Sequence, residues 1–382
     1  MPAAELPFYT VLVPLFQEAA VLPDLVGSLA AIDYPRERHE VFILIESVDI
    51  ETQAALLALS LPSHFRVLQV PDCQPRTKPK ALNYALPFAR GSMIVIYDAE
   101  DRPQPNQLRQ AADLFARAPL TLGCAQARLN IYNPGQSWIS RQFTIEYTML
   151  FDAILPTLER YALPVPLGGT SNHFRRETLE QIGGWDPYNV TEDADIGIRL
   201  ARLGYSTVVL PSTTWEEAPT TLGVWMRQRT RWVKGWMQTW LVHTRDLRAL
   251  HRELGLKGAI GFHATFGGLV LSALAQPLCF LLLGYQAWTG DLFAPSEHVL
   301  EVVVLCIALG NLAIGYVISM LVGILSVVRR GRIRLALHAL ALPVYWLLIS
   351  LAAYRALWQL LRSPFLWEKT PHGRARPRRS RS

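Results

Sequence analysis

The stretch Met93-Ile94-Val95-Ile96-Tyr97-Asp98-Ala99-Glu100-Asp101 is a short β-rich run that ends in acidic side chains. Similar runs precede it, and helical segments fall between them. The expected strands are Tyr9–Val13, Val41–Ile45, Arg66–Val70 and Met93–Tyr97, and the expected helices are residues 21–31, 50–59 and 79–90. Strands and helices that alternate at this spacing predict an α/β fold with a mostly parallel sheet. Ligands bind such open sheets beyond the carboxyl ends of the strands, and Asp98 lies at such an end.

The acidic turn after Tyr97 is a candidate metal site. Carboxylates at the end of a strand can hold a hard divalent cation, which can in turn bridge a diphosphate. Asp98 is the first candidate ligand, and either Glu100 or Asp101 could complete the coordination. A solvated acidic turn would have the same sequence, so the turn alone does not decide between a ligand set and a loop.

Other strand ends carry groups that suit a nucleotide: an aromatic ring that could stack on a base, carboxylates that could bind a nucleoside, and lysines that could neutralise phosphate. These candidates are Phe16, Glu18, Glu46, Asp49, Lys78 and Lys80. Polar loops and solvated lysine pairs are common, so each residue taken singly is weak support.

A second acidic group, Thr191-Glu192-Asp193, precedes an amphipathic helix expected at 194–203. A carboxylate here could remove a proton from an acceptor hydroxyl, a role worth roughly 100- to 10,000-fold in rate. The same residues suit a helix N-cap, and both roles are compatible if Thr191 or Glu192 caps while Asp193 catalyses.

A tryptophan-rich basic helix is expected at about residues 221–247. Within it Gln228, Arg231 and Trp232 stand at i, i+3 and i+4, which places them on one helix face. The arginine and the amide could grip a diphosphate, and the tryptophan could stack on a sugar. Its composition also suits a helix that lies at the membrane interface, and we expect both roles together.

The last third of the chain, residues 258–362, is mostly apolar and is predicted to be a transmembrane helical region. Residues 262–288 and 299–328 are each long enough to cross a bilayer, which needs about 20 residues. Residues 335–361 contain Pro343 and Arg355, so they could be a kinked span or an interfacial helix. Two or four crossings would place the basic tail, residues 363–382, on the side of the catalytic domain, as the positive-inside rule requires, whereas three would not.

The charged and sulfur-containing residues exclude some classes of protein. The clustered arginines border membrane-length segments, which suits contact with lipid headgroups rather than with nucleic acid. The four cysteines form no CxxC pair, so neither a zinc site nor a disulfide framework is expected. No signal peptide is expected at the N-terminus.

In their order and spacing these elements resemble the membrane-bound family 2 glycosyltransferases, the group of cellulose, hyaluronan and poly-N-acetylglucosamine synthases. That family shares a D…DxD…TED…QxxRW series. Here the series corresponds to Glu46 or Asp49, then Asp98-Ala99-Glu100, Thr191-Glu192-Asp193 and Gln228-Arg229-Thr230-Arg231-Trp232. Two departures stand out: Glu100 replaces the second aspartate of DxD, and Glu46 holds the place of the first aspartate of the series.

The resemblance implies a GT-A fold for residues 1–250, a UDP-sugar donor and Mg²⁺ or Mn²⁺. It implies that Asp193, with Glu192, acts as the base, that Gln228 and Arg231 bind the diphosphate, and that Trp232 contacts the acceptor. Gly168 to His173 resemble a loop beside the acceptor's end, which makes Asn172 and His173 acceptor-binding candidates. Residues 363–373 resemble a motif of bacterial exopolysaccharide synthases and could act as a gating loop over the donor.

The function that the resemblance implies is transfer of hexosyl units to a growing β-linked polysaccharide, with inversion, by an enzyme of the bacterial inner membrane whose catalytic domain is cytoplasmic. A polymer channel with so few spans would need further subunits or a homo-oligomer. Two alternatives remain: a non-processive enzyme that glycosylates a lipid such as a polyprenyl phosphate, and a non-catalytic receptor or assembly subunit.

Overall fold

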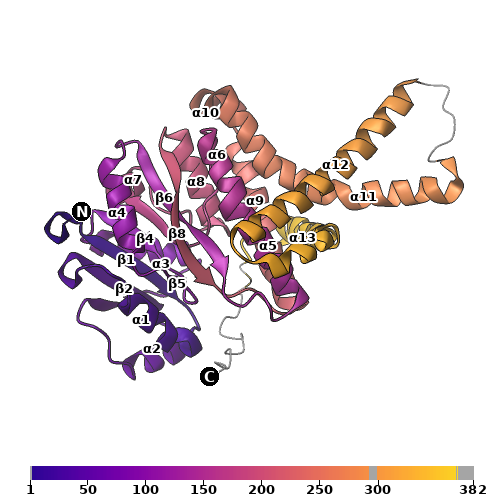
Figure 1. The fold of residues 1–382 in the computed structure, drawn as a ribbon. Helices are drawn as coiled ribbons and strands as arrows, with labels where there is room; N and C mark the ends of the chain where they lie inside the picture. The colour runs from indigo at the N-terminus through magenta and orange to yellow at the C-terminus, as the bar shows by residue number, and fades with distance from the viewer. Residues whose placement is uncertain (1, 292–298, 367, 369–382) are drawn as a thin grey trace.

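The chain is described by a computed structural model that covers residues 2–291, 299–366 and 368. Its N-terminal part is built on an eight-stranded sheet with the strand order β3-β2-β1-β4-β7-β6-β8-β5 (Figure 1). The strands are β1 (Tyr9–Leu15), β2 (His39–Glu46), β3 (Phe65–Val70), β4 (Met93–Ile96), β5 (Arg102–Pro103), β6 (Leu122–Ile131), β7 (Asn172–Arg175) and β8 (Ser206–Glu216). The four strands expected from sequence are confirmed, and they lie side by side and parallel in one half of this sheet.

Helices cover both faces of the sheet. Side chains from α1, α2 and α4 pack on one face, and side chains from α3, α7 and α8 pack on the other. These helices are α1 (Leu22–Ala30), α2 (Ile50–Leu57), α3 (Lys78–Ala85), α4 (Gln107–Arg117), α7 (Arg176–Gln181) and α8 (Glu192–Arg202). Because both faces are covered, the central strands β2 and β4 are buried along their whole length, which explains their continuous apolar runs.

The antiparallel strand β7 pairs with β4 on one side and β6 on the other, so the sheet is mixed. This arrangement is an α/β fold with a mostly parallel sheet, as the sequence predicts. The carboxyl ends of β1, β2 and β4 face the same edge, since these strands run parallel in register with Tyr9 opposite both His39 and Met93. The loops at this edge therefore bring the predicted site residues of the first hundred positions together.

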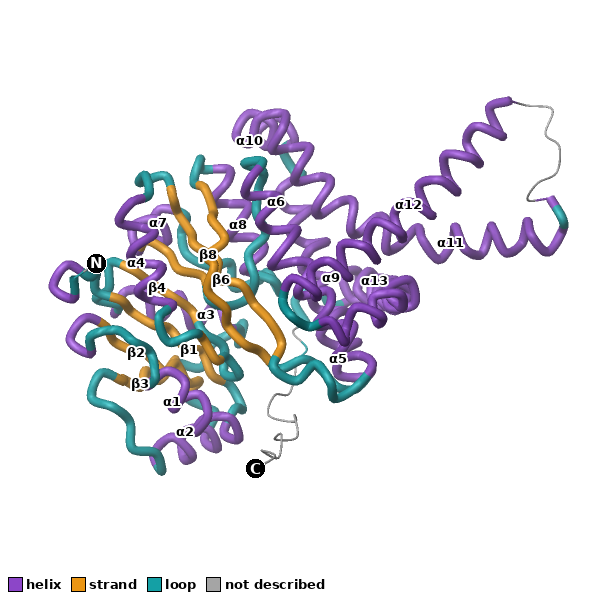
Figure 2. The backbone as a smooth tube through the Cα atoms, viewed as in Figure 1, coloured by secondary structure: helices purple, strands orange, loops and turns teal. Residues whose placement is uncertain are grey.

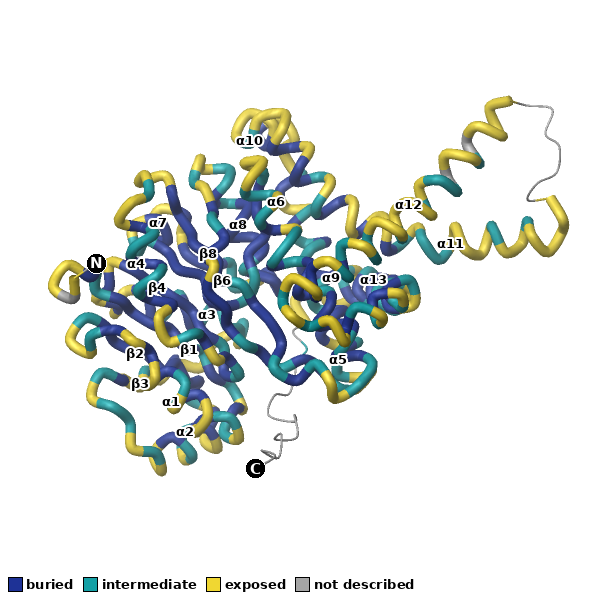
Figure 3. Tube along the Cα trace, in the orientation of Figure 1, coloured by how far each residue is buried: buried dark blue, intermediate teal, exposed yellow. Residues whose placement is uncertain are grey.

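The remaining helices lie beside the sheet and beyond it. They are α5 (Trp138–Met149), α6 (Leu155–Arg160), α9 (Leu222–His243), α10 (Leu247–Phe262), α11 (Gly268–Thr289), α12 (Val299–Arg329) and α13 (Leu342–Arg362). Figure 2 shows α11 and α12 projecting away from the sheet as two long arms, whereas α13 stays beside α9 and α5. Figure 3 shows that both arms are largely exposed, although their residues are apolar, such as Leu281 and Ile307.

Within the described ranges, three helical stretches are long and apolar enough to cross a membrane: Leu247–Thr289, Val299–Arg329 and Ile333–Arg362. Pro343 does not kink the last one. It stands in the first turn of α13, where the missing N–H costs nothing, after a 3-10 segment Ile333–Ala341. Arg355 is paired by Glu368, with Nη1–Oε2 at 2.8 Å and Nη2–Oε1 at 2.6 Å.

Both ends of α13 contact the catalytic part of the chain. Just before the helix, the His338 carbonyl accepts a hydrogen bond from Gln142 of α5 at 2.8 Å. Just after it, the Pro364 carbonyl accepts one from Gln238 of α9 at 3.0 Å. Both contacts hold α13 beside the catalytic part of the chain.

Candidate active site

The acidic turn after β4 is built around a buried carboxylate. Asp101 Oδ2 accepts a hydrogen bond from the Asp98 backbone N–H at 2.7 Å and another from the Thr170 hydroxyl, and only 1% of Asp101 is exposed. Burial, followed by the charges of Asp98 and Glu100, raises the pKa of Asp101 well above its ordinary value. Asp101 Oδ2 therefore fixes the backbone of the turn, while Asp101 Oδ1 is buried without a hydrogen-bond partner among the described residues, so both Glu100 and Asp101 stay candidates beside Asp98.

Asp98 and Asp193 come together across Gly169, although they are far apart in the sequence. A Cβ atom built on Gly169 would stand 3.2 Å from Asp193 Oδ2, 3.7 Å from Asp98 Oδ2 and 3.9 Å from Lys78 Nζ. The end of β4, the first turn of α8 and the first turn of α3 thus converge on one point. Sequence order gave no distance between these three groups, and the fold brings them within reach of one ligand.

Lys78 supplies the positive charge of this cluster. Its Nζ donates to Asp98 Oδ1 and to the Gly169 carbonyl, the latter at 2.6 Å. Burial disfavours the ammonium form, but the neighbouring carboxylates, first Asp98 and then Glu192, outweigh it and raise the pKa of Lys78. A permanently charged lysine that is shared by the candidate metal ligand and the loop can also meet a phosphate.

Glu192 and Asp193 begin α8 inside the cluster. Asp193 Oδ1 accepts a hydrogen bond from the Ala194 N–H at 2.7 Å. Burial raises the pKa of Asp193 despite that bond and the nearby charges of Lys78 and Arg231. Burial and then the charge of Asp193 raise the pKa of Glu192 to about 7. A carboxylate with a raised pKa is a better proton acceptor at neutral pH than an ordinary one.

The side-chain cap predicted for Thr191 is not formed. Thr191 occupies the N-cap position of α8, but its side chain makes no capping hydrogen bond. The helix α9 packs closely on this residue, since a Cβ on Gly235 would stand 2.1 Å from Thr191 Oγ1.

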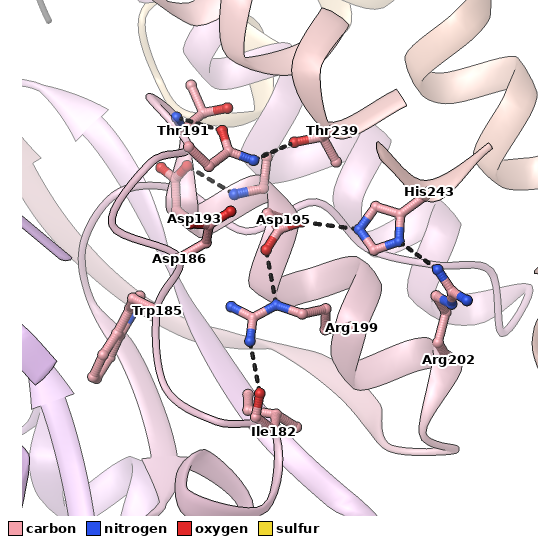
Figure 4. A network of polar contacts seen from close by, with 12 residues as sticks. Ile182, Trp185, Asp186, Thr191, Asp193, Asp195, Arg199, Arg202, Thr239 and His243 are labelled. Carbon is pink, nitrogen blue, oxygen red and sulfur yellow. Dashed lines mark hydrogen bonds and ion pairs between the residues drawn. The ribbon is translucent and has the colours of Figure 1, made fainter. Parts of the chain in front are cut away.

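A buried polar network ties α8 to α9 behind the cluster (Figure 4). Asp195 Oδ1 accepts from His243 Nε2 at 2.9 Å, and Asp195 Oδ2 accepts from Arg199 Nε at 2.8 Å. His243 Nδ1 in turn meets Arg202 Nη1 at 2.8 Å. Since an arginine only donates, Nδ1 of the imidazole is placed to accept and Nε2 to donate, and the network fixes the register of the helix that carries Asp193.

The tryptophan-rich helix α9 runs through residues 222–243, close to the predicted 221–247. Gln228 is buried, and the charge of Arg231 lowers the pKa of both Glu192 and Asp193, so Arg231 lies beside the candidate base. Trp232 faces a different neighbour. It stacks on Tyr147 of α5, with ring centroids 6.1 Å apart and planes inclined by 27°.

Other predicted nucleotide-binding residues also make contacts within the protein. Glu46 and Lys80 bind each other, with Nζ–Oε2 at 2.7 Å, and burial raises the pKa of Glu46. Asp49 caps α2 through the Thr52 N–H at 3.2 Å. Glu18 is largely buried, with its N–H on the Thr52 hydroxyl at 3.1 Å, and Phe16 follows β1 at the same edge.

The two acceptor candidates of the glycine loop do not join the cluster. His173 is fully buried in β7, between the Tyr9 hydroxyl at 3.2 Å and Gln107 at 3.3 Å, and burial lowers its pKa to about 3. Asn172 is also buried, and its Nδ2 donates to the Gly168 carbonyl at 2.6 Å. Both residues are buried because they belong to the strand β7 inside the sheet. The motif resemblance did not identify this strand, so it could not show their burial.

Glu216 is a site residue that sequence reasoning missed. It ends β8 and is 9% exposed, and its pKa is raised by burial and then by the charges of Asp101, Glu100 and Asp98. It forms a side-chain hydrogen bond with Tyr147. Its position at the end of a strand was a usable signal, but the sequence did not identify β8.

The acidic residues fit a hard divalent cation in kind. Asp98 lies just beyond the carboxyl end of β4, at the open edge of the sheet, and Glu100 lies two residues further in the same turn. Carboxylate oxygens are the ligands that Mg²⁺ and Mn²⁺ prefer. Within the described residues, no three His, Cys, Asp or Glu side chains form a complete cage. Such a site would leave coordination positions for the oxygens of a substrate diphosphate.

Comparison with known proteins gives this site a family. A family model described as glycosyltransferase like family 2 matches residues 7–235, which include every element of the cluster. The chain belongs to glycosyltransferase family 2. Membership of this family speaks against the non-catalytic alternative.

Curated members of family 2 resemble this chain at moderate identity. A probable glycosyltransferase YdaM of Bacillus subtilis is 28% identical over 60% of this chain and 56% of its own length. A beta-monoglucosyldiacylglycerol synthase of Trichormus variabilis is 28% identical over 69% of this chain and 55% of its own. The matched region thus spans little more than half the length of these curated relatives.

A solved structure supports the fold of this family 2 member over nearly its whole length. The mannosyltransferase PcManGT from Pyrobaculum calidifontis, in complex with GDP-Man and Mn²⁺, superposes with a TM-score of 0.60. The match covers 94% of this chain and 89% of that chain at 22% sequence identity. At this identity the likeness speaks for the GT-A fold alone.

Proposed function

We propose that this chain is an inverting glycosyltransferase that moves a hexosyl unit from a UDP-sugar to an acceptor hydroxyl at a membrane surface. The observation that carries the proposal is the convergence of Asp98, Lys78 and Asp193 on Gly169. A donor diphosphate needs positive charge on its oxygens, and the acceptor hydroxyl needs a base on the opposite side of the anomeric carbon. One cluster supplies both.

In the proposed reaction, Asp193 takes the proton of the acceptor hydroxyl as its oxygen attacks the anomeric carbon. The bond from that carbon to the UDP oxygen breaks, and UDP leaves with the electron pair. A single displacement inverts the configuration, so an α-linked donor gives a β-linked product. Lys78, Arg231 and Gln228 are the residues that we assign to the diphosphate. Glu192, protonated in part at neutral pH, lies next to the base.

A Mg²⁺ or Mn²⁺ ion held by Asp98 with Glu100 or Asp101 would neutralise charge on the leaving diphosphate. The chain's own residues orient the reactants. The Asp101 carboxylate fixes the backbone of Asp98, and the Ala194 N–H orients Asp193. We predict that Asp98→Ala loses metal-dependent UDP binding by calorimetry, while UDP affinity without metal changes little.

Two acceptor classes have specific support. Relatives named beta-monoglucosyldiacylglycerol synthases, from Trichormus and from Synechocystis, favour a lipid hydroxyl. The Gln228-to-Trp232 motif favours a growing polysaccharide, because the resemblance ties this motif to processive enzymes. The distinction is measurable: a single added sugar per acceptor supports the lipid, and a ladder of products supports the polymer.

The proposed location is the bacterial inner membrane with the catalytic domain in the cytoplasm. The basic end of α12 packs on the catalytic domain, where Arg330 Nη2 meets Asp152 Oδ1 at 2.7 Å and Arg332 donates to the Ile131 carbonyl at 2.7 Å. With α13 along the domain, α11 and α12 would be the two crossings, which obeys the positive-inside rule. Trp367 and residues 369–382, most of the predicted basic tail and part of the predicted gating motif, lie outside the described residues.

The decisive experiment is a screen of the purified protein in nanodiscs against radiolabelled nucleotide sugars with Mg²⁺ or Mn²⁺, followed by product sizing. Transfer that is lost in Asp193→Asn while UDP binding persists is the expected result. Near-normal turnover in that variant would refute the base assignment, and the absence of hydrolysis or transfer with every donor would refute the function.

A further inference from the structure

A cavity of about 440 Å³ lies between the catalytic part of the chain and the apolar helices. Its walls come from α5, α9, α11 and α13, and most of the side chains that line it are apolar. This volume falls in the range of small-molecule pockets, about 300–1,000 Å³. Trp232, the last residue of the Gln228-to-Trp232 motif, forms part of the wall.

The inner end of the cavity adjoins the acidic cluster through Tyr147. This tyrosine lines the cavity and stacks on Trp232, and its hydroxyl is hydrogen-bonded to Glu216. Glu216 is close enough to Asp101 and Asp98 for their charges to raise its pKa. One aromatic ring therefore separates the space in the cavity from the carboxylates of the reaction centre.

The outer end of the cavity is formed by residues of the helix that leaves the catalytic domain. Leu269, Ser272, Ala273 and Gln276 of α11 line it, and Leu269 is 37% exposed. From this point α11 continues as an exposed apolar arm (Figure 3). An occupant can therefore reach the cavity from the same apolar phase that covers the arm.

The charges of the cavity wall cancel. Arg229 and Glu146 form a two-pronged ion pair, with Nη1–Oε1 at 2.7 Å, and the Tyr345 hydroxyl bridges them, 2.7 Å from Glu146 and 3.0 Å from Arg229. A phosphate would need a cation that is not already neutralised, and these lining residues offer none. The cavity wall therefore suits an uncharged occupant.

We propose that this cavity holds the acyl part of a single uncharged glycerolipid, and that the free hydroxyl of this lipid is the acceptor of the sugar. This inference rests on the proposed function and chooses between its two acceptors. Trp232 and Tyr147 would then guide the lipid head towards Asp193, and the hydrocarbon would stay among the side chains of α5, α11 and α13. An apolar cavity of this size has no place for the hydroxyl-rich chain of a polysaccharide.

The test compares two tryptophan substitutions on α11 in nanodiscs that contain diacylglycerol with a photoactivatable diazirine on one acyl chain. Ser272→Trp fills the cavity from its wall, whereas Ala275→Trp places the same side chain on an exposed position of the same helix that does not line it. Cross-linked peptides are mapped by mass spectrometry. Transfer to diacylglycerol and UDP binding are measured in parallel.

We expect wild type and Ala275→Trp to cross-link through α5, α9, α11 or α13 residues of the cavity. Ser272→Trp should lose these cross-links and transfer to diacylglycerol about tenfold more weakly, which is the affinity that burial of roughly two methylene groups supplies. UDP binding should be unchanged in both variants. Equal transfer by the two variants, cross-links elsewhere, or polymer as the product would overturn the cavity assignment. Loss of donor hydrolysis in every form would instead count against the proposed function.

Discussion

The substitution Gly169→Ala tests whether Asp98 and Asp193 act on one ligand. The glycine has no unusual backbone conformation, so alanine can adopt it, and the only new atom is a methyl group 3.2 Å from Asp193 Oδ2. That contact is tight enough to displace the carboxylate by a few tenths of an ångström. A misplacement of about 1 Å can cost roughly 100-fold in rate. We expect kcat to fall by about 10- to 100-fold, which corresponds to about 1.4–2.7 kcal/mol.

The assay for Gly169→Ala is transfer from a radiolabelled donor, with thermal unfolding as the check on folding. A matched control is Gly223→Ala in the first turn of α9, where a Cβ would meet nothing within 4 Å. Neither variant should unfold at lower temperature, because an alanine in a compatible conformation usually stabilises a protein by about 0.4–1 kcal/mol. If Gly169→Ala keeps the kcat of the control, the two carboxylates do not share a ligand and the reasoning is wrong.

Three further outcomes follow from the site. Burial raises the pKa of Asp193, and the base works only when deprotonated, so kcat/KM should rise with pH through a pKa above the ordinary value of an aspartate; a profile governed by an ordinary or lowered pKa would contradict the assignment. His243→Ala removes the buried donor that links α9 to α8 and should lower the free energy of unfolding by about 1–3 kcal/mol in denaturant titrations. A variant as stable as the wild type would contradict this expectation. Arg229→Ala leaves Glu146 without its cation, so we expect a loss of about 3 kcal/mol, and Arg229→Lys should not restore it because it cannot form the two-pronged pair.

The parallel half of the sheet was predictable because its signals are local. Apolar runs such as Val41–Ile45 and Met93–Tyr97 are buried on both faces, so they stand out as continuous hydrophobic segments between helices. The later strands β6 and β8 mix polar residues such as Gln126 and Thr214 into their buried faces, where side-chain hydrogen bonds satisfy them. Such strands have no clear hydrophobic periodicity in the sequence. The antiparallel position of β7 between β4 and β6 depends on long-range pairing, which local sequence patterns do not reveal.

The sequence indicated several residues that the fold brings together, but not the contacts that each of them makes. Strand ends placed Asp98 correctly at the open edge, and the resemblance selected Asp193. Lys78 and Lys80 were equivalent in the sequence, yet they stand two residues apart on α3, about 200° around the helix. Lys78 therefore reaches Asp98 and Lys80 reaches Glu46. Which carboxylate each lysine meets depends on the distances from α3 to β2 and β4 in the folded chain, and these distances cannot be derived from the spacing of residues in the sequence.

The helix α9 shows why the prediction that Gln228, Arg231 and Trp232 share one helix face was only partly informative. Positions i, i+3 and i+4 do share a side, but Arg231 lies beside the carboxylates and Trp232 lines the apolar cavity. About two turns further along α9, Gln238 accepts a hydrogen bond from the Val190 N–H at 3.3 Å and donates one to the Pro364 carbonyl at 3.0 Å. It therefore joins the loop before Asp193 to the segment after α13.

A single helix therefore contacts the reaction centre, the cavity and the C-terminal segment. A displacement of that segment would act on the loop before Asp193 through the Gln238 side chain. Gln238→Ala should uncouple them, lowering kcat with little change in UDP affinity. An equal loss of UDP affinity would show instead that α9 acts only on the donor.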